Sequence, residues 1–238
     1  MKLANPYTAV HAAIASAILL GAMFCRGFSG YWHRAVYGDP TLMKPAIILA
    51  CLFLSMLMFG ALALFCWIST LFQRRDSAEP APPPDRLKAV RLAAVTAPAT
   101  VAIAIGAACL GGWIFKLLLG VEPMDQELIR FLTSPDYPLA TRVGLCALMV
   151  VQAPFTEEPL FRGVIFRGYL KKLPPWAAMA LSGFVFAVCH CNAAAFLGLW
   201  YVGVAFAWLY WKTGSILAPI TSHLLFNLAN LALAFVIR

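Results

Sequence analysis

The chain has 238 residues, of which 62% are hydrophobic and only 12% charged, and it carries a formal net charge of +8. Because soluble domains contain about 25% charged residues, this composition excludes an ordinary soluble globular domain and indicates an integral membrane protein. The positive charge lies mainly in short loops, where the positive-inside rule and anionic lipid account for it, so it does not indicate nucleic-acid binding.

Seven apolar segments reach or approach the roughly 20 residues needed to cross a bilayer. Lipid offers backbone groups no hydrogen-bond partners, so these segments are expected to be helical. The fifth and sixth are short and nearly continuous, which predicts a tight hairpin or incomplete crossing. The sequence therefore predicts an all-α polytopic membrane bundle of about seven transmembrane helices (six to eight), over residues 7–25, 45–72, 92–119, 141–169, 176–192, 194–211 and 216–237.

The chain divides into two parts by the distribution of its polar residues. Residues 1–139 contain N-terminal spans without a recognisable motif, and the four prolines and mixed charges of residues 73–88 predict a solvated linker between two of them. Residues 140–238 contain all the polar clusters described below, so we expect the functional transmembrane core there. The basic residues fall almost evenly on both sides of the membrane, so they leave the orientation undecided.

Three of the last four apolar segments carry ionisable or amide side chains. These are TEEPLFRG at residues 156–163, FAVCH ending at His190, and HLLFN at residues 223–227. Charged groups inside a membrane segment are costly, and they usually face a bundle interior or a water-filled cavity. This placement favours a functional site over a lipid-facing surface.

Helical spacing predicts how these side chains are arranged. Glu158 and Arg162 are four residues apart and share a helix face, so Arg162 can neutralise Glu158. Glu157 points about 100° away and has no obvious local partner. His223 and Asn227 are also four residues apart and therefore project together.

The residue types limit the chemistry that such a site can perform. One interhelical hydrogen bond contributes only about 0.6–2 kcal/mol, and a single polar pair would suit a structural role. Two Glu, one Arg, two His and one Asn, in a chain with ten acids and four His, favour an active or transport site. They supply a carboxylate to take a proton from water, an imidazole to share it, and donors for an oxyanion.

A metal site is the alternative use of the same side chains. Glu157, His190 and His223 form a three-ligand set that could hold zinc with one open position. We expect that no cofactor or metal is needed, because the two His come from separate segments and a cationic Arg162 nearby disfavours a divalent ion. Cys189 and Cys191 flank His190, but successive helical residues cannot converge on one ion, so they are interpreted as packing residues.

The three patterns E-E-x-x-x-R, F-x-x-x-H and H-x-x-x-N, in this order over residues 140–238, resemble the CAAX-protease and bacteriocin-processing family of intramembrane proteases. The resemblance implies an endopeptidase in which Glu157 and His190 activate the hydrolytic water. It also implies that Phe186 is a packing residue beside the site.

The remaining roles come from the same resemblance. Arg162 would orient the glutamate pair with Glu158 as its partner, and His223 with Asn227 would stabilise the oxyanion. Pro159, directly after the glutamates, departs from the pattern and should kink the helix because it removes a backbone donor.

We therefore interpret the chain as an intramembrane endopeptidase acting on a membrane-associated peptide, for which a prenylated C-terminus is one substrate class. It is expected to act within the lipid bilayer, in the plasma membrane if the chain is prokaryotic, without nucleic acid; the sequence leaves its oligomeric state open. Two alternatives remain. A proton-coupled transporter would use Glu157 and the histidines as a relay and would predict inverted repeats, which the sequence lacks. A non-catalytic immunity or binding protein would keep only the fold.

Overall fold

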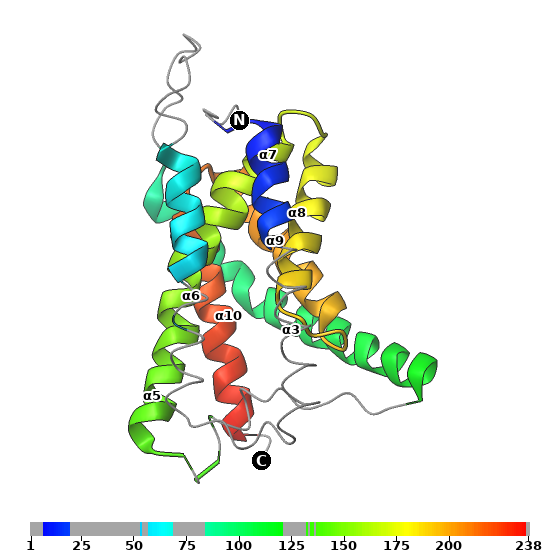
Figure 1. The fold of residues 1–238 in the computed structure, drawn as a ribbon. Helices are drawn as coiled ribbons and strands as arrows, with labels where there is room; N and C mark the ends of the chain where they lie inside the picture. The colour runs from blue at the N-terminus through cyan, green and yellow to red at the C-terminus, as the bar shows by residue number, and fades with distance from the viewer. Residues whose placement is uncertain are drawn as a thin grey trace, which may run out of the picture.

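The computed structural model describes residues 7–19, 53, 57–68, 84–120, 132, 134–135 and 137–236, and these contain helices and no β-strand (Figure 1). Each of the seven predicted apolar segments contains a helix. In chain order they are Ala9–Leu19, Leu57–Ile68, α3 (Arg86–Leu119), the continuous run α5–α7 (Leu139–Tyr169), α8 (Pro175–Cys189), α9 (Phe196–Thr213) and α10 (Leu217–Val236). The all-α membrane bundle is confirmed.

Helix α3 begins earlier than predicted. The side chain of Asp85 accepts a hydrogen bond of 3.0 Å from the backbone N–H of Lys88, so it caps the first turn, and the helix includes the last three residues of the predicted linker. Gly120 ends the helix in the left-handed conformation, at φ 67°, with its N–H bonded to Lys116. Most of the rest of the predicted linker lies outside the described residues.

The helix that carries the glutamates contains two π-helical stretches. It consists of α5 (Leu139–Ala147), the π-helical turn η2 (Leu148–Gln152), α6 (Ala153–Glu158), the π-helical run η3 (Pro159–Phe166) and α7 (Arg167–Tyr169). The chain stays helical through Pro159 (φ −56°, ψ −37°), where the spacing changes from α to π. π-helical turns inside α-helices are frequently found at functional sites.

Two glycines let α8 and α9 cross at close range. A Cβ built on Gly203 would lie 2.6 Å from the Cα of Gly183, so no larger residue fits without moving the backbone. Small residues at such crossings are typical of helix packing in membranes, where backbones approach closely. Gly198 of α9 approaches α3 in the same way, since its Cβ would meet the carbonyl of Ala104 at 2.5 Å.

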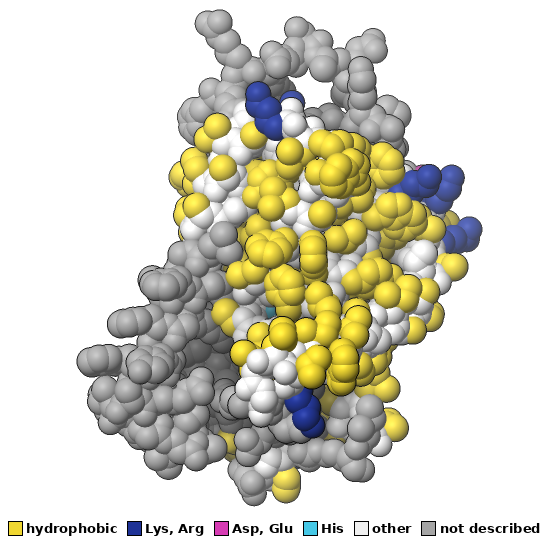
Figure 2. All heavy atoms as spheres, turned by 90° about the vertical axis from the view of Figure 1, so that its right-hand side faces the viewer, with side chains coloured by type: hydrophobic (Ala, Val, Ile, Leu, Met, Phe, Trp, Pro, Cys, Tyr) yellow, Lys and Arg dark blue, Asp and Glu magenta, His cyan; other side chains and the backbone are white. Residues whose placement is uncertain are grey.

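The described surface suits a lipid environment. Within the described residues, three helices are long and apolar enough to cross a membrane: α3, the run Leu139–Tyr169, and α10. Figure 2 shows one face on which the described side chains are mostly hydrophobic, with Lys and Arg at its margins. Large exposed side chains such as Trp113, Leu118 and Trp176 would be unfavourable in water but are expected against acyl chains.

Candidate active site

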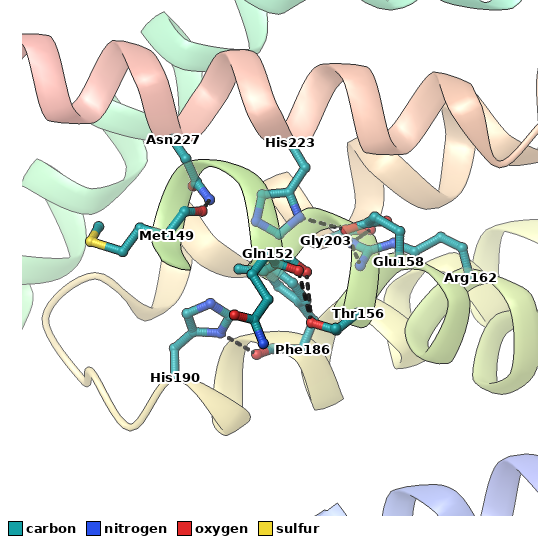
Figure 3. Close-up of polar contacts among 11 residues, drawn as sticks. Met149, Gln152, Thr156, Glu158, Arg162, Phe186, His190, Gly203, His223 and Asn227 are labelled. Carbon is teal, nitrogen blue, oxygen red and sulfur yellow. Dashed lines mark hydrogen bonds and ion pairs between the residues drawn. The ribbon is translucent and has the colours of Figure 1, made fainter. Parts of the chain in front are cut away.

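The site is built around Glu158, which is fully buried. One of its oxygens, Oε1, accepts a hydrogen bond of 3.0 Å from Arg162 Nη1 and lies 2.7 Å from Nδ1 of His223 (Figure 3). The Arg162 ion pair is the one that the four-residue spacing predicts. Because a carboxylate oxygen accepts, Nδ1 of His223 carries the proton that joins α10 to α6.

Arg162 is fully buried and is held from several directions. Its Nη2 donates to the carbonyl of Gly203 at 3.2 Å. Its guanidinium carbon also lies 4.6–5.7 Å from the centroids of three aromatic rings, within the range of cation–π attraction; these rings belong to Phe161, Phe186 and Phe206. A charge in this position has little freedom to move, so it fixes the carboxylate of Glu158 with it.

Glu157 differs from its neighbour in having no ion-pair contact within the described part of the chain. Its side chain is 4% exposed, and Oε2 has no hydrogen-bond partner among the described residues. The carboxylate interacts electrostatically with Arg162 and with Cys189, the residue before His190. The second oxygen of Glu158 likewise lacks a partner there, but its charge is shared with two donors. Glu157 is therefore the carboxylate better placed to accept a proton.

His190 follows the last residue of α8, and its ring orientation is set by that helix. Nδ1 lies 2.8 Å from the carbonyl oxygen of Phe186, and that oxygen can only accept, so Nδ1 carries a proton. In the neutral ring Nε2 is then the acceptor. The buried Phe186 ring packs against both histidines, with its centroid 4.5 Å from that of His190 and 5.9 Å from that of His223, which confirms Phe186 as a packing residue beside the site.

Asn227 reaches the glutamate-bearing helix at a different point. Its Nδ2 donates to the backbone carbonyl of Met149 at 2.7 Å, in the π-helical turn η2 (Figure 3). His223 and Asn227 thus both project from α10 toward the same helix, as their spacing predicts. One amide hydrogen of Asn227 is left for another acceptor.

The alternative metal set does not come together in this geometry. Within the described part of the chain, no group of three His, Cys, Asp or Glu side chains lies close enough to hold a metal ion. Glu157, His190 and His223 are therefore not arranged as three ligands of one ion. That the reaction needs no metal stays a prediction.

Three contributors to the site were not predicted from the sequence. Gly203 supplies a carbonyl to Arg162, Met149 supplies one to Asn227, and the ring of Phe206 lies 5.2 Å from that of His223. The two carbonyls belong to the backbone, which residue types do not reveal. Pro154 was the available indication for Met149, because a proline inside a helix leaves a carbonyl without its donor.

The family-model comparison covers the part of the chain that carries these side chains. Residues 139–229 match the family model described as type II CAAX prenyl endopeptidase Rce1-like. A Bacillus subtilis protein described as "Putative membrane peptidase YdiL" is 32% identical over 77 residues, which span 32% of this chain and 32% of that protein. No solved structure gives a significant match. Over residues 139–229 the chain is therefore similar to the Rce1-like CAAX endopeptidases, and the aligned stretch spans about a third of the length of the Bacillus subtilis relative.

Proposed function

We propose that the chain is an intramembrane endopeptidase in which Glu157 activates the attacking water. The observation that carries this proposal is the contrast between two adjacent glutamates. Glu158 shares its charge with Arg162 and His223, whereas Glu157 is buried and makes no ion pair with the described residues. A buried carboxylate with an available oxygen, in a family described as endopeptidases, suits a general base.

The reaction is a hydrolysis that moves one proton twice. Glu157 takes a proton from water as the water oxygen bonds to the peptide carbonyl carbon. The tetrahedral intermediate then expels the amine as the C–N bond breaks, and the proton passes to that nitrogen. His190 assists at the first step, since its Nδ1 proton is donated to the carbonyl of Phe186 and Nε2 of the neutral ring is left as an acceptor.

The developing oxyanion needs a donor, and His223 is suited to this role. Its Nδ1 proton is already given to Glu158, so only the imidazolium form has a second N–H, on Nε2. The Glu158 carboxylate stabilises this cation at a contact of 2.7 Å. Arg162 holds Glu158 in place. The Arg162–Glu158 ion pair therefore orients His223, the oxyanion donor, and does not act on the attacking water. The family resemblance adds Asn227 as a second donor, through the amide hydrogen that Met149 does not accept.

The site's position in an apolar bundle supports a membrane-associated substrate. We propose a membrane-associated peptide or protein, cleaved within the lipid bilayer or at its surface, and the family description suggests a prenylated C-terminus. We expect neither nucleic acid nor a cofactor as a partner. If the chain is prokaryotic, the plasma membrane is the site of action.

The test uses purified protein in liposomes with an internally quenched peptide that ends in a farnesylated CAAX sequence. Wild type should cleave it, and Glu157→Gln should lose about 10²–10⁴-fold in kcat, the usual contribution of a general base. The same peptide without the farnesyl group tests the substrate class. Cleavage by Glu157→Gln within about tenfold of wild type would contradict the base assignment.

A further inference from the structure

The helix that carries the glutamates contains a break in its hydrogen bonding at Pro154. In the π-helical turn η2, the N–H of Ala153 bonds to the carbonyl of Leu148, five residues earlier. At the same spacing, the next donor would be the N–H of residue 154, which would bond to Met149. Residue 154 is proline and has no N–H, so the π-helical turn ends there.

The carbonyl of Met149 consequently has no helical donor. At the α-helical spacing its donor would be the N–H of Ala153, which Leu148 already uses. At the π-helical spacing its donor would be Pro154. Backbone carbonyls inside a membrane protein need a partner, since lipid supplies none. The side chain of Asn227 fills this position from α10, 78 residues along the chain, with its Nδ2 at 2.7 Å (Figure 3).

We propose that Asn227 is a positioning residue, which supplies the hydrogen bond that Pro154 cannot make and so fixes the winding of η2. The α6 segment that follows is only six residues long and ends in Glu157 and Glu158. A change from π to α spacing in η2 would shift its register by one residue, or about 100° of rotation. Asn227 therefore sets the direction in which both glutamates point.

The positioning role and the oxyanion role differ in how the effect of losing Asn227 depends on the residue at position 154. A positioning residue that acts through Met149 loses its importance once residue 154 has its own N–H. An oxyanion donor keeps its importance whatever residue occupies position 154. The Pro154→Ala substitution supplies that N–H, so it separates the two roles. The positioning role itself does not require the proposed function; only its effect on catalysis does.

The experiment compares four proteins in nanodiscs: wild type, Asn227→Ala, Pro154→Ala and the double variant. Amide hydrogen exchange is followed by mass spectrometry on peptides covering residues 148–158. Asn227→Ala should speed exchange there by about tenfold, the size expected for one lost hydrogen bond. The double variant should exchange at the rate of Pro154→Ala alone. Unchanged exchange in Asn227→Ala, or an equal increase in both backgrounds, would overturn the proposal.

A matched control is available one turn along α10. Asn230 donates to the carbonyl of Phe226 in its own helix at 2.8 Å, so Asn230→Ala removes an amide without touching η2. It should leave exchange in residues 148–158 at the wild-type rate.

The kinetic comparison uses the farnesylated quenched peptide. The loss in kcat from Asn227→Ala should shrink at least tenfold in the Pro154→Ala background, and an equal loss in both backgrounds would assign Asn227 to the oxyanion alone. If wild type fails to cleave the peptide, the proposed function fails, while the exchange comparison still decides the role of Asn227.

Discussion

Replacing Glu158 with Gln should destabilise the protein far more than replacing Glu157 with Gln, although the two residues are adjacent and both buried. Glu158 is the anionic partner of a fully buried Arg162 and also contacts His223. The substitution Glu158→Gln would keep the shape of the side chain but would remove its charge. The guanidinium would then lose its ion-pair partner while it stays buried against aromatic rings.

The magnitude follows from how these groups are buried. Removing one partner of a buried ion pair typically costs about 3–5 kcal/mol, because the other charge stays buried without compensation. Glu157 makes no such pair with the described residues, and its Oε2 makes no hydrogen bond with them. Its substitution should cost about 1 kcal/mol or less, the value of one ordinary hydrogen bond. The two variants should therefore differ by at least about 2 kcal/mol.

The assay is equilibrium unfolding of both variants in mixed micelles, followed by tryptophan fluorescence. The double variant Glu158→Gln with Arg162→Met is the control, since it removes both charges and should recover part of the loss. Equal destabilisation by Glu157→Gln and Glu158→Gln, or the reverse order, would refute the reasoning. The reverse order would mean that Glu157, not Glu158, is the ion-pair partner of Arg162.

Three further predictions concern other parts of the site. Gly203→Ala should destabilise the protein by about 1–3 kcal/mol through overpacking against Gly183, and it should lower kcat by displacing the carbonyl that holds Arg162. Gly163→Ala is the control, because a Cβ there meets nothing within 4 Å, and it should be tolerated in the same unfolding and cleavage assays. His190→Ala should lower kcat by about 10²-fold or more, while His11→Ala, outside the site, should not, and equal effects would remove His190 from the reaction. Cleavage should persist after exhaustive chelation, and activity that is lost and then restored by stoichiometric zinc would overturn the metal-free mechanism.

Much of the architecture was predictable because it depends on local patterns. Long apolar segments predict helices in lipid wherever they occur, and the spacing of Glu158 and Arg162 predicts their ion pair on one helix face. The same helical spacing turns Glu157 away from Arg162, and it correctly predicted that Glu157 has no ion-pair partner among the described residues. The contact between His223 and Glu158 could not be predicted, because the sequence placed both residues in the site but did not show which glutamate contacts which histidine.

The remaining features depend on contacts between distant segments. The π-helical turn η2 ends just before Pro154 and the π-helical run η3 begins at Pro159, yet a proline alone does not say whether the helix breaks, kinks or changes its winding. The close crossing at Gly183 and Gly203 determines where a backbone carbonyl meets Arg162, and only the packed helices show it. The early start of α3 was missed because the charged residues after Asp85 suggested a linker, although Asp85 itself is a good helix cap.

The most direct test of the central claim is a comparison of protein C-termini in membranes that contain wild type or Glu157→Gln at equal abundance. C-terminal peptides from both membranes are enriched and identified by mass spectrometry. The account predicts at least one membrane-associated protein with a new C-terminus in the wild-type membranes, reduced about 100-fold or more with Glu157→Gln. The same set of C-termini at similar levels in both membranes would contradict peptide hydrolysis by a Glu157-activated water.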